Sequence, residues 1–107
     1  MLFRSGCYIL ETLNDPADPQ ASIVRARVAP GVTTAWHRLR ETTERYVILE
    51  GTGEAFVGDT APQTVEPGDI VLIPPMARQR IRNTGQADLV FLAVCTPRFQ
   101  ADCYIAG

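Results

Sequence analysis

The sequence predicts an all-β domain, and two observations support this fold class. Eight glycines and eight prolines in 107 residues fall mainly between short runs of strand-forming residues. Several of these runs alternate apolar and polar side chains, which is the period of a strand with one buried face. No stretch has the period of a long helix, and short strands at this spacing are typical of a β-sandwich or barrel.

Three strands are expected in the first half of the chain. Residues 22–29 alternate apolar side chains with two arginines, and Pro30 ends the run. Residues 35–40 and 44–50 follow, and Gly51 closes the second of these two runs. The pattern assigns no strand before residue 22.

Turn residues divide the second half of the chain in the same way. A glycine–aspartate pair ends the first run, Pro74 and Pro75 separate the second from the third, and Asn83 begins the turn into the fourth. Pro97 ends the last run, and the final ten residues are left unassigned. The expected strands here span residues 54–57, 70–73, 78–83 and 89–95.

Length, charge and composition limit the classes of function. The chain, residues 1–107, is long enough for one domain with a modest core. A net charge of −2 gives no broad attraction to nucleic acid or to an anionic membrane. All ten basic residues are arginine, which excludes a Schiff-base lysine. No run approaches the ~20 apolar residues of a membrane span, and the N-terminus does not resemble a signal peptide. We therefore expect a cytoplasmic protein whose three cysteines are reduced thiols.

Two groups of residues stand at fixed spacings around the expected turns. In the first group, alternation along a strand directs His37 and Leu39 to the same side. The second group is centred on the break that two consecutive prolines introduce. The first group consists of Gly31, His37, Leu39, Glu44 and Gly51, and the second of Gly68, Pro74, Met76, Gln79 and Asn83.

These spacings resemble the two signature motifs of the cupin superfamily, over residues 23 to 99. The resemblance implies a double-stranded β-helix, the jelly-roll barrel of cupins. It also implies that positions 37, 39, 44 and 79 converge on one divalent metal. A typical cupin has histidine where this chain has Leu39 and Gln79, and glycine where it has Met76.

The resemblance leaves three candidate metal ligands, which are His37, Glu44 and Gln79. They offer an imidazole, a carboxylate and an amide oxygen, whereas Leu39 offers no donor. This set is poorer than the two-histidine, one-carboxylate triad of non-haem iron. We expect a divalent ion (Zn, Fe, Ni or Mn), with a metal-free polar cluster as the alternative.

The substitutions also predict an apolar wall in the barrel. A mostly apolar pocket with a few convergent polar groups is the usual form of a small-molecule site. The alternative is that the same side chains are simply core. The predicted pocket residues are Leu39, Tyr46, Ile48, Met76 and Ile81.

Two functions follow from the resemblance. The first is a small cupin with a divalent-metal site in the barrel mouth, which would serve an enzyme acting on an unidentified small molecule. The second is a non-catalytic cupin that binds or senses a small molecule at a degraded, metal-free site. The expected partners are a small-molecule ligand and, from the resemblance, a second copy of the chain in a homodimer.

Overall fold

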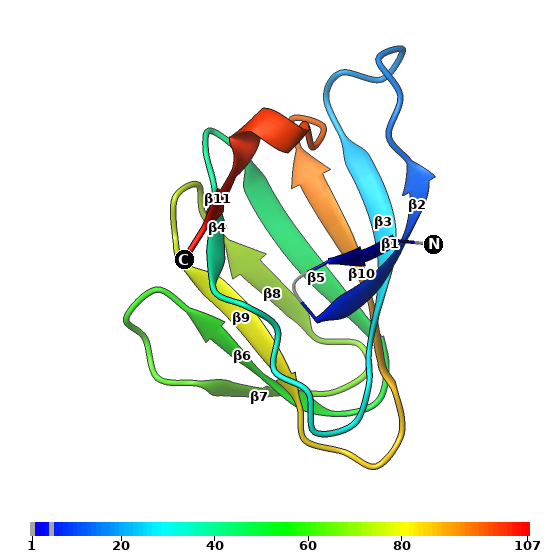
Figure 1. The fold of residues 1–107 in the computed structure, drawn as a ribbon, viewed down its shortest axis with the longest axis vertical. Coiled ribbons are helices and arrows are strands. Elements are labelled where there is room, and N and C mark those ends of the chain that lie inside the picture. Colours follow the sequence, from blue (N-terminus) through cyan, green and yellow to red (C-terminus); the bar gives the residue numbers. More distant parts are fainter. Residues whose placement is uncertain (1, 5) are drawn as a thin grey trace.

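The computed structural model describes residues 2–4 and 6–107, and these form two facing antiparallel sheets (Figure 1). The first sheet has the strand order β1 (Leu2–Arg4), β2 (Cys7–Leu13), β3 (Ser22–Val28), β10 (Leu89–Thr96), β5 (Thr43–Glu50) and β8 (Ile70–Ile73). The second has the order β11 (Tyr104–Ala106), β4 (His37–Leu39), β9 (Gln79–Asn83), β6 (Gly53–Val57) and β7 (Gln63–Val65). One short 3-10 helix, η1 (Ala101–Cys103), precedes β11.

The predicted all-β jelly roll is confirmed, and the strand at 70–73 has the predicted bounds. Four observed strands were not predicted, namely β1, β2, β7 and β11. Three of them have only three residues each, too few to display an alternating pattern. The fourth, β2, has apolar residues on both faces, since Tyr8 and Leu10 are exposed while Cys7 is buried.

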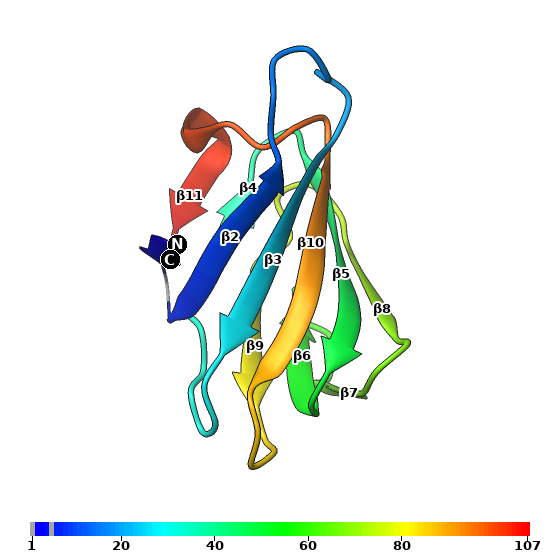
Figure 2. The same cartoon turned by 90° about the vertical axis from the view of Figure 1, so that its right-hand side faces the viewer.

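The core lies between the two sheets. Figure 2 shows the strands of the first sheet side by side, as the layer that covers one side of this core. Ile48, Ile73 and Ile81 are among the largest fully buried side chains. In β9, Gln79 and Ile81 are buried while the arginines between and beside them are not, as the alternation predicts. Burial of these apolar side chains is the main force that holds the sheets together.

The framework residues of both motifs have structural roles in the barrel. Gly51 has φ 85°, and a Cβ there would lie 2.6 Å from the Asp88 carbonyl oxygen, so no other residue fits without a shift. The buried Asn83 amide donates to the carbonyls of Val28 at 2.9 Å and Ala87 at 2.8 Å. These bonds join the end of β9 to the first sheet.

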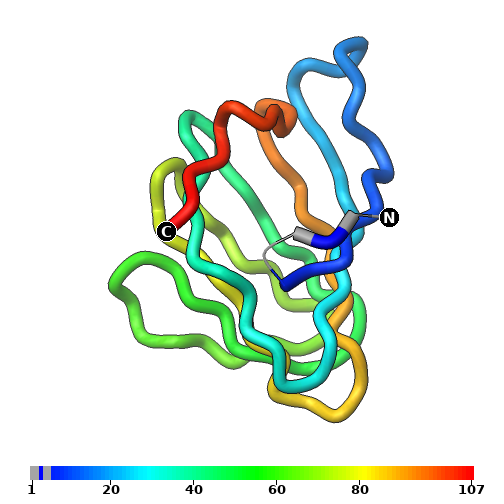
Figure 3. Tube along the Cα trace, viewed as in Figure 1, coloured from blue at the N-terminus to red at the C-terminus, as the bar shows by residue number. Residues whose placement is uncertain are grey.

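The C-terminal segment adds an edge strand to the second sheet. Tyr104 pairs with Leu39, and Ala106 pairs with His37. Figure 3 shows this segment running beside residues 37–39. The segment therefore covers β4, the strand that carries the histidine of the first motif. Within residues 2–4 and 6–107, no helix is long and apolar enough to cross a membrane.

Candidate functional site

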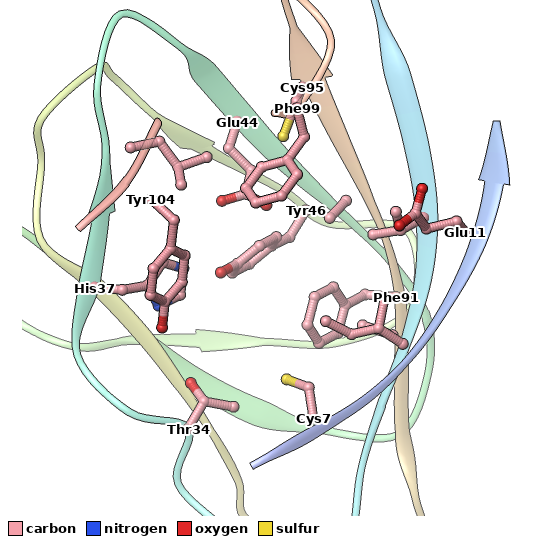
Figure 4. Close-up of a pocket in the computed structure, with 15 residues that line it drawn as sticks. Cys7, Glu11, Thr34, His37, Glu44, Tyr46, Phe91, Cys95, Phe99 and Tyr104 are labelled. Atoms are coloured by element: carbon pink, nitrogen blue, oxygen red, sulfur yellow. The ribbon is translucent and has the colours of Figure 1, made fainter. Parts of the chain in front are cut away.

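A cavity of about 80 Å³ lies between the sheets (Figure 4). Its walls are mostly apolar, and four of its residues are aromatic: Tyr46, Phe91, Phe99 and Tyr104. Its polar residues include Thr34, His37 and Glu44, with Glu11 on β2. Few polar groups in an apolar cavity are the usual form of a small-molecule site.

Glu44 is the carboxylate inside this cavity. It lies on β5 between Cys95 of β10 and Ile73 of β8, and only 8% of it is exposed. Its Oε1 atom is buried and has no hydrogen-bond partner among the described residues. Burial raises the pKa of Glu44 from 4.5 to about 7, although the neighbouring Gln79 and Cys95 side chains act to lower it. This carboxyl therefore holds its proton to a higher pH than an exposed glutamate does.

Gln79 does not line the cavity but contacts a residue that does. Tyr46 lines the cavity, and its hydroxyl donates a hydrogen bond to Gln79 Oε1. The Gln79 Nε2 atom is buried and has no partner in the described part of the chain. Burial, followed by the charge of Glu44, raises the pKa of Tyr46, so this phenol stays protonated and donates.

His37 forms one wall together with the C-terminal strand. Its Nδ1 atom lies 3.1 Å from the Ala35 carbonyl oxygen. Its ring stacks on Tyr104, with centroids 5.1 Å apart and an angle of 16° between the planes. The backbone pairing of His37 with Gln79 aligns β4 and β9 at this point. The orientation of the imidazole is thus set by a carbonyl and by an aromatic face.

Two cysteines also line the cavity, Cys7 from β2 and Cys95 from β10. Burial raises the pKa of Cys7 to about 12 and raises that of Cys95 as well. Both are therefore protonated thiols at neutral pH, which makes them weak nucleophiles. Cys7, Cys95 and Cys103 are all free and buried.

Half of the predicted site residues line the cavity, and these are His37, Leu39, Glu44 and Tyr46. Gln79 does not line the cavity, but it accepts a hydrogen bond from Tyr46, which does. Ile48 and Ile81 were predicted to line the pocket, but they are 1% and 0% exposed and belong to the core. Both side chains belong to one core cluster, in which the inward side chains of the two sheets fill the space between them.

The prediction that Met76 lines the pocket is corrected. Its side chain is 45% exposed, and it lies in the turn between β8 and β9. Its φ of 67° follows two prolines that end β8, and its amide donates to the Leu39 carbonyl. The left-handed conformation therefore directs the chain through a turn, and it is a conformation that glycine adopts with less strain.

Several lining residues were not predicted from the sequence. Cys7, Ile9 and Glu11 come from β2, while Phe99 and Tyr104 come from the C-terminal segment. Neither segment had been assigned a strand. The only sequence signal was the pair of aromatic residues near the C-terminus, which has no periodicity to give it a direction.

The residues present do not fit a tightly held metal. No group of three or more histidine, cysteine, aspartate or glutamate side chains among residues 2–4 and 6–107 is arranged to hold an ion. The Gln79 amide oxygen, the third predicted ligand atom, accepts the Tyr46 hydrogen bond instead. His37 and Glu44 alone give fewer protein ligands than the three that are usual in catalytic zinc sites.

The arrangement of the sheets is that of double-stranded β-helix proteins. A protein of this kind from Klebsiella pneumoniae has a TM-score of 0.84 and 17% identity, covering 100% of this chain and 89% of its own. A nucleoside dehydratase from Streptomyces has a TM-score of 0.84 and 16% identity, covering 99% and 82%. A predicted oxalate decarboxylase from Thermotoga maritima has a TM-score of 0.77 and 26% identity, covering 85% and 80%.

Sequence comparison agrees with the fold. The cupin domain family matches residues 24–95, and the chain belongs to this family. The uncharacterized protein MJ1618 of Methanocaldococcus jannaschii is 33% identical over 98 residues, covering 90% of this chain and 78% of that protein. A glucose-6-phosphate isomerase from Pyrococcus horikoshii is 33% identical over 63 residues, or 55% of this chain. The chain spans only about a third of the length of this isomerase, because the match covers 33% of it.

Proposed function

We propose that this cupin binds a small organic molecule in the cavity between its sheets. The observation that supports this proposal most is the buried Glu44 Oε1 without a hydrogen-bond partner, in a cavity with aromatic walls. An unpaired polar atom in such a place costs free energy, on the order of 1–3 kcal/mol. A ligand that supplies the missing partner would recover this cost, so the site is built for an occupied state.

The chemistry open to this site is proton transfer. Glu44 has a pKa of about 7 and therefore donates or accepts a proton at neutral pH. The Tyr46 hydroxyl and the His37 ring would orient a ligand beside it. Enzymes and binding proteins both use such carboxyls, so turnover is a separate measurement made once a ligand is found.

A cavity-filling variant tests the binding proposal. Ala93 lines the cavity on β10, where Ala93→Leu would occupy part of its volume. Ala35→Leu is the matched control, because Ala35 is exposed and does not line the cavity. Each protein is screened by thermal shift against uncharged, anionic and cationic metabolite-sized compounds. Compounds that raise the melting temperature should act on wild type and Ala35→Leu but not on Ala93→Leu.

Two results would contradict the proposal. In the first, no compound stabilises the wild-type protein, or the Ala93→Leu variant responds equally. In the second, purified protein carries one zinc, iron, nickel or manganese ion per chain and His37→Ala removes it. That result would favour the metal centre that the cupin resemblance implies.

A further inference from the structure

We propose that the ligand of this cavity is a small organic cation, a protonated amine carried on an apolar or aromatic body. This inference rests on the proposed binding function and names the chemical class of its ligand. It is based on the charge, the unsatisfied hydrogen bonding and the aromatic content of the cavity lining.

The charges that line the cavity favour a cation. Among the described residues, Glu44 and Glu11 line it, whereas no arginine does. Glu44 is 92% buried, since 8% of it is exposed, and its Oε1 atom has no partner. An ammonium group would supply both the missing hydrogen-bond donor and the opposite charge. A carboxylate or phosphate ligand would instead be desolvated beside another carboxylate.

The aromatic rings add a second, independent preference for positive charge. The ring centroids of Tyr46 and Phe91 lie 4.5 Å apart with an angle of 46° between the planes, and Phe99 and Tyr104 also line the cavity. Figure 4 shows these rings and the Glu44 carboxyl facing the same space. The faces of aromatic rings attract ammonium groups, and the effect is larger when the site is desolvated. The Glu44 carboxylate and the ring faces thus attract the ammonium group of an amine, while the rings also contact its apolar body.

A nearby arginine does not neutralise the interior of the cavity. Arg98 lies in an adjoining surface groove that also contains Glu11, and its guanidinium donates to Asn14 Oδ1 at 2.8 Å. Arg98 does not line the cavity itself. Glu11 is exposed and borders both spaces, so the argument depends on the buried Glu44.

The size of the cavity selects the probes. A volume of about 80 Å³ is smaller than the ~150 Å³ engineered cavities that bind benzene. A short branched alkyl group therefore fits the cavity as the buried body of the ligand, whereas an aromatic ring would enter it only in part. Suitable probes are benzylamine and isobutylamine, each compared with the alcohol and the carboxylate of the same skeleton.

Calorimetric titration of these six compounds tests the inference. The titrations are made at pH 8, about one unit above the pKa of Glu44, where this carboxyl is ionised. At least one amine should bind about tenfold or more tightly than its alcohol, and the carboxylates should bind weakest. Glu44→Gln keeps the shape of the side chain and should remove this preference. Glu66→Gln, at an exposed acid outside the cavity, should retain it.

The outcomes separate this inference from the proposed function. An alcohol or carboxylate that binds as well as its amine overturns the cation assignment and leaves small-molecule binding intact. An amine preference that survives in Glu44→Gln overturns the role of Glu44. If no amine binds while other compounds stabilise wild type but not Ala93→Leu, the ligand class is wrong. If no compound of any charge binds, the proposed function itself fails.

Discussion

Replacing Glu44 by glutamine should change how the stability of the protein depends on pH. The pKa of this carboxyl is about 7 in the folded state and 4.5 in the reference state. Below pH 4.5 both states are protonated, and the group makes no difference. Between pH 4.5 and 7 the unfolded chain releases the proton while the folded chain keeps it. The free energy of unfolding therefore falls as the pH rises through this window.

The size of the effect follows from the shift. A change from 4.5 to about 7 corresponds to about 3 kcal/mol, since one pKa unit is about 1.4 kcal/mol. Wild type should lose this amount between pH 4 and pH 8 through Glu44. The neutral amide of Glu44→Gln has no such dependence, so the variant should gain about 3 kcal/mol relative to wild type across the same range.

Urea unfolding at several pH values measures this difference directly. Comparing the variants at each pH cancels the contributions of the other titrating groups. Glu66→Gln is the control, because that side chain is exposed on the turn between β7 and β8 and should follow wild type. A difference between wild type and Glu44→Gln that stays constant from pH 4 to pH 8 would refute the claim that burial raises the pKa of this carboxyl.

Three further predictions concern the framework and the assembly. Met76→Gly should raise the free energy of unfolding by about 1 kcal/mol, because φ is 67° at this position; an unchanged or lower urea midpoint would contradict this. Asn83→Ala should lower the free energy of unfolding by about 3 kcal/mol, because the buried carbonyl of Val28 and two other backbone groups lose their partner. A loss below 1 kcal/mol in urea unfolding would show that water replaces the amide. The predicted homodimer could use the edge strand β8, where Ile70 and Leu72 are 66% and 60% exposed. In that case, replacing both residues by lysine should yield a folded monomer in sedimentation velocity. A wild-type protein that is itself a monomer would exclude the dimer.

The sequence was informative about the fold because turn residues act locally. Gly51 has a positive φ, and Asn83 bonds to backbone groups across a short turn, so each leaves a signal at a fixed spacing. The alternation of β9 was visible for the same reason, since each side chain reports its own face. His37 and Glu44 could be placed in the site from these spacings.

The rest of the site depends on contacts between distant segments. Tyr104 reaches the cavity because β11 pairs with β4. In this pairing Tyr104 lies opposite Leu39, which is 65 residues earlier in the chain. Three residues carry too little pattern to predict such a pairing. The fate of the Gln79 oxygen was equally hidden, because only the packed structure shows that Tyr46 donates to it. The metal expectation depended on that oxygen, so the sequence alone left the chemistry open.

The most direct test is a crystal structure of the protein soaked with the tightest-binding amine of the series. The account predicts the ligand between the two sheets, with its ammonium nitrogen within hydrogen-bond distance of Glu44 Oε1 and its apolar body against Tyr46 and Phe91. Ligand density outside the cavity would contradict it. So would a metal ion coordinated by His37 and Glu44 in the place of the amine.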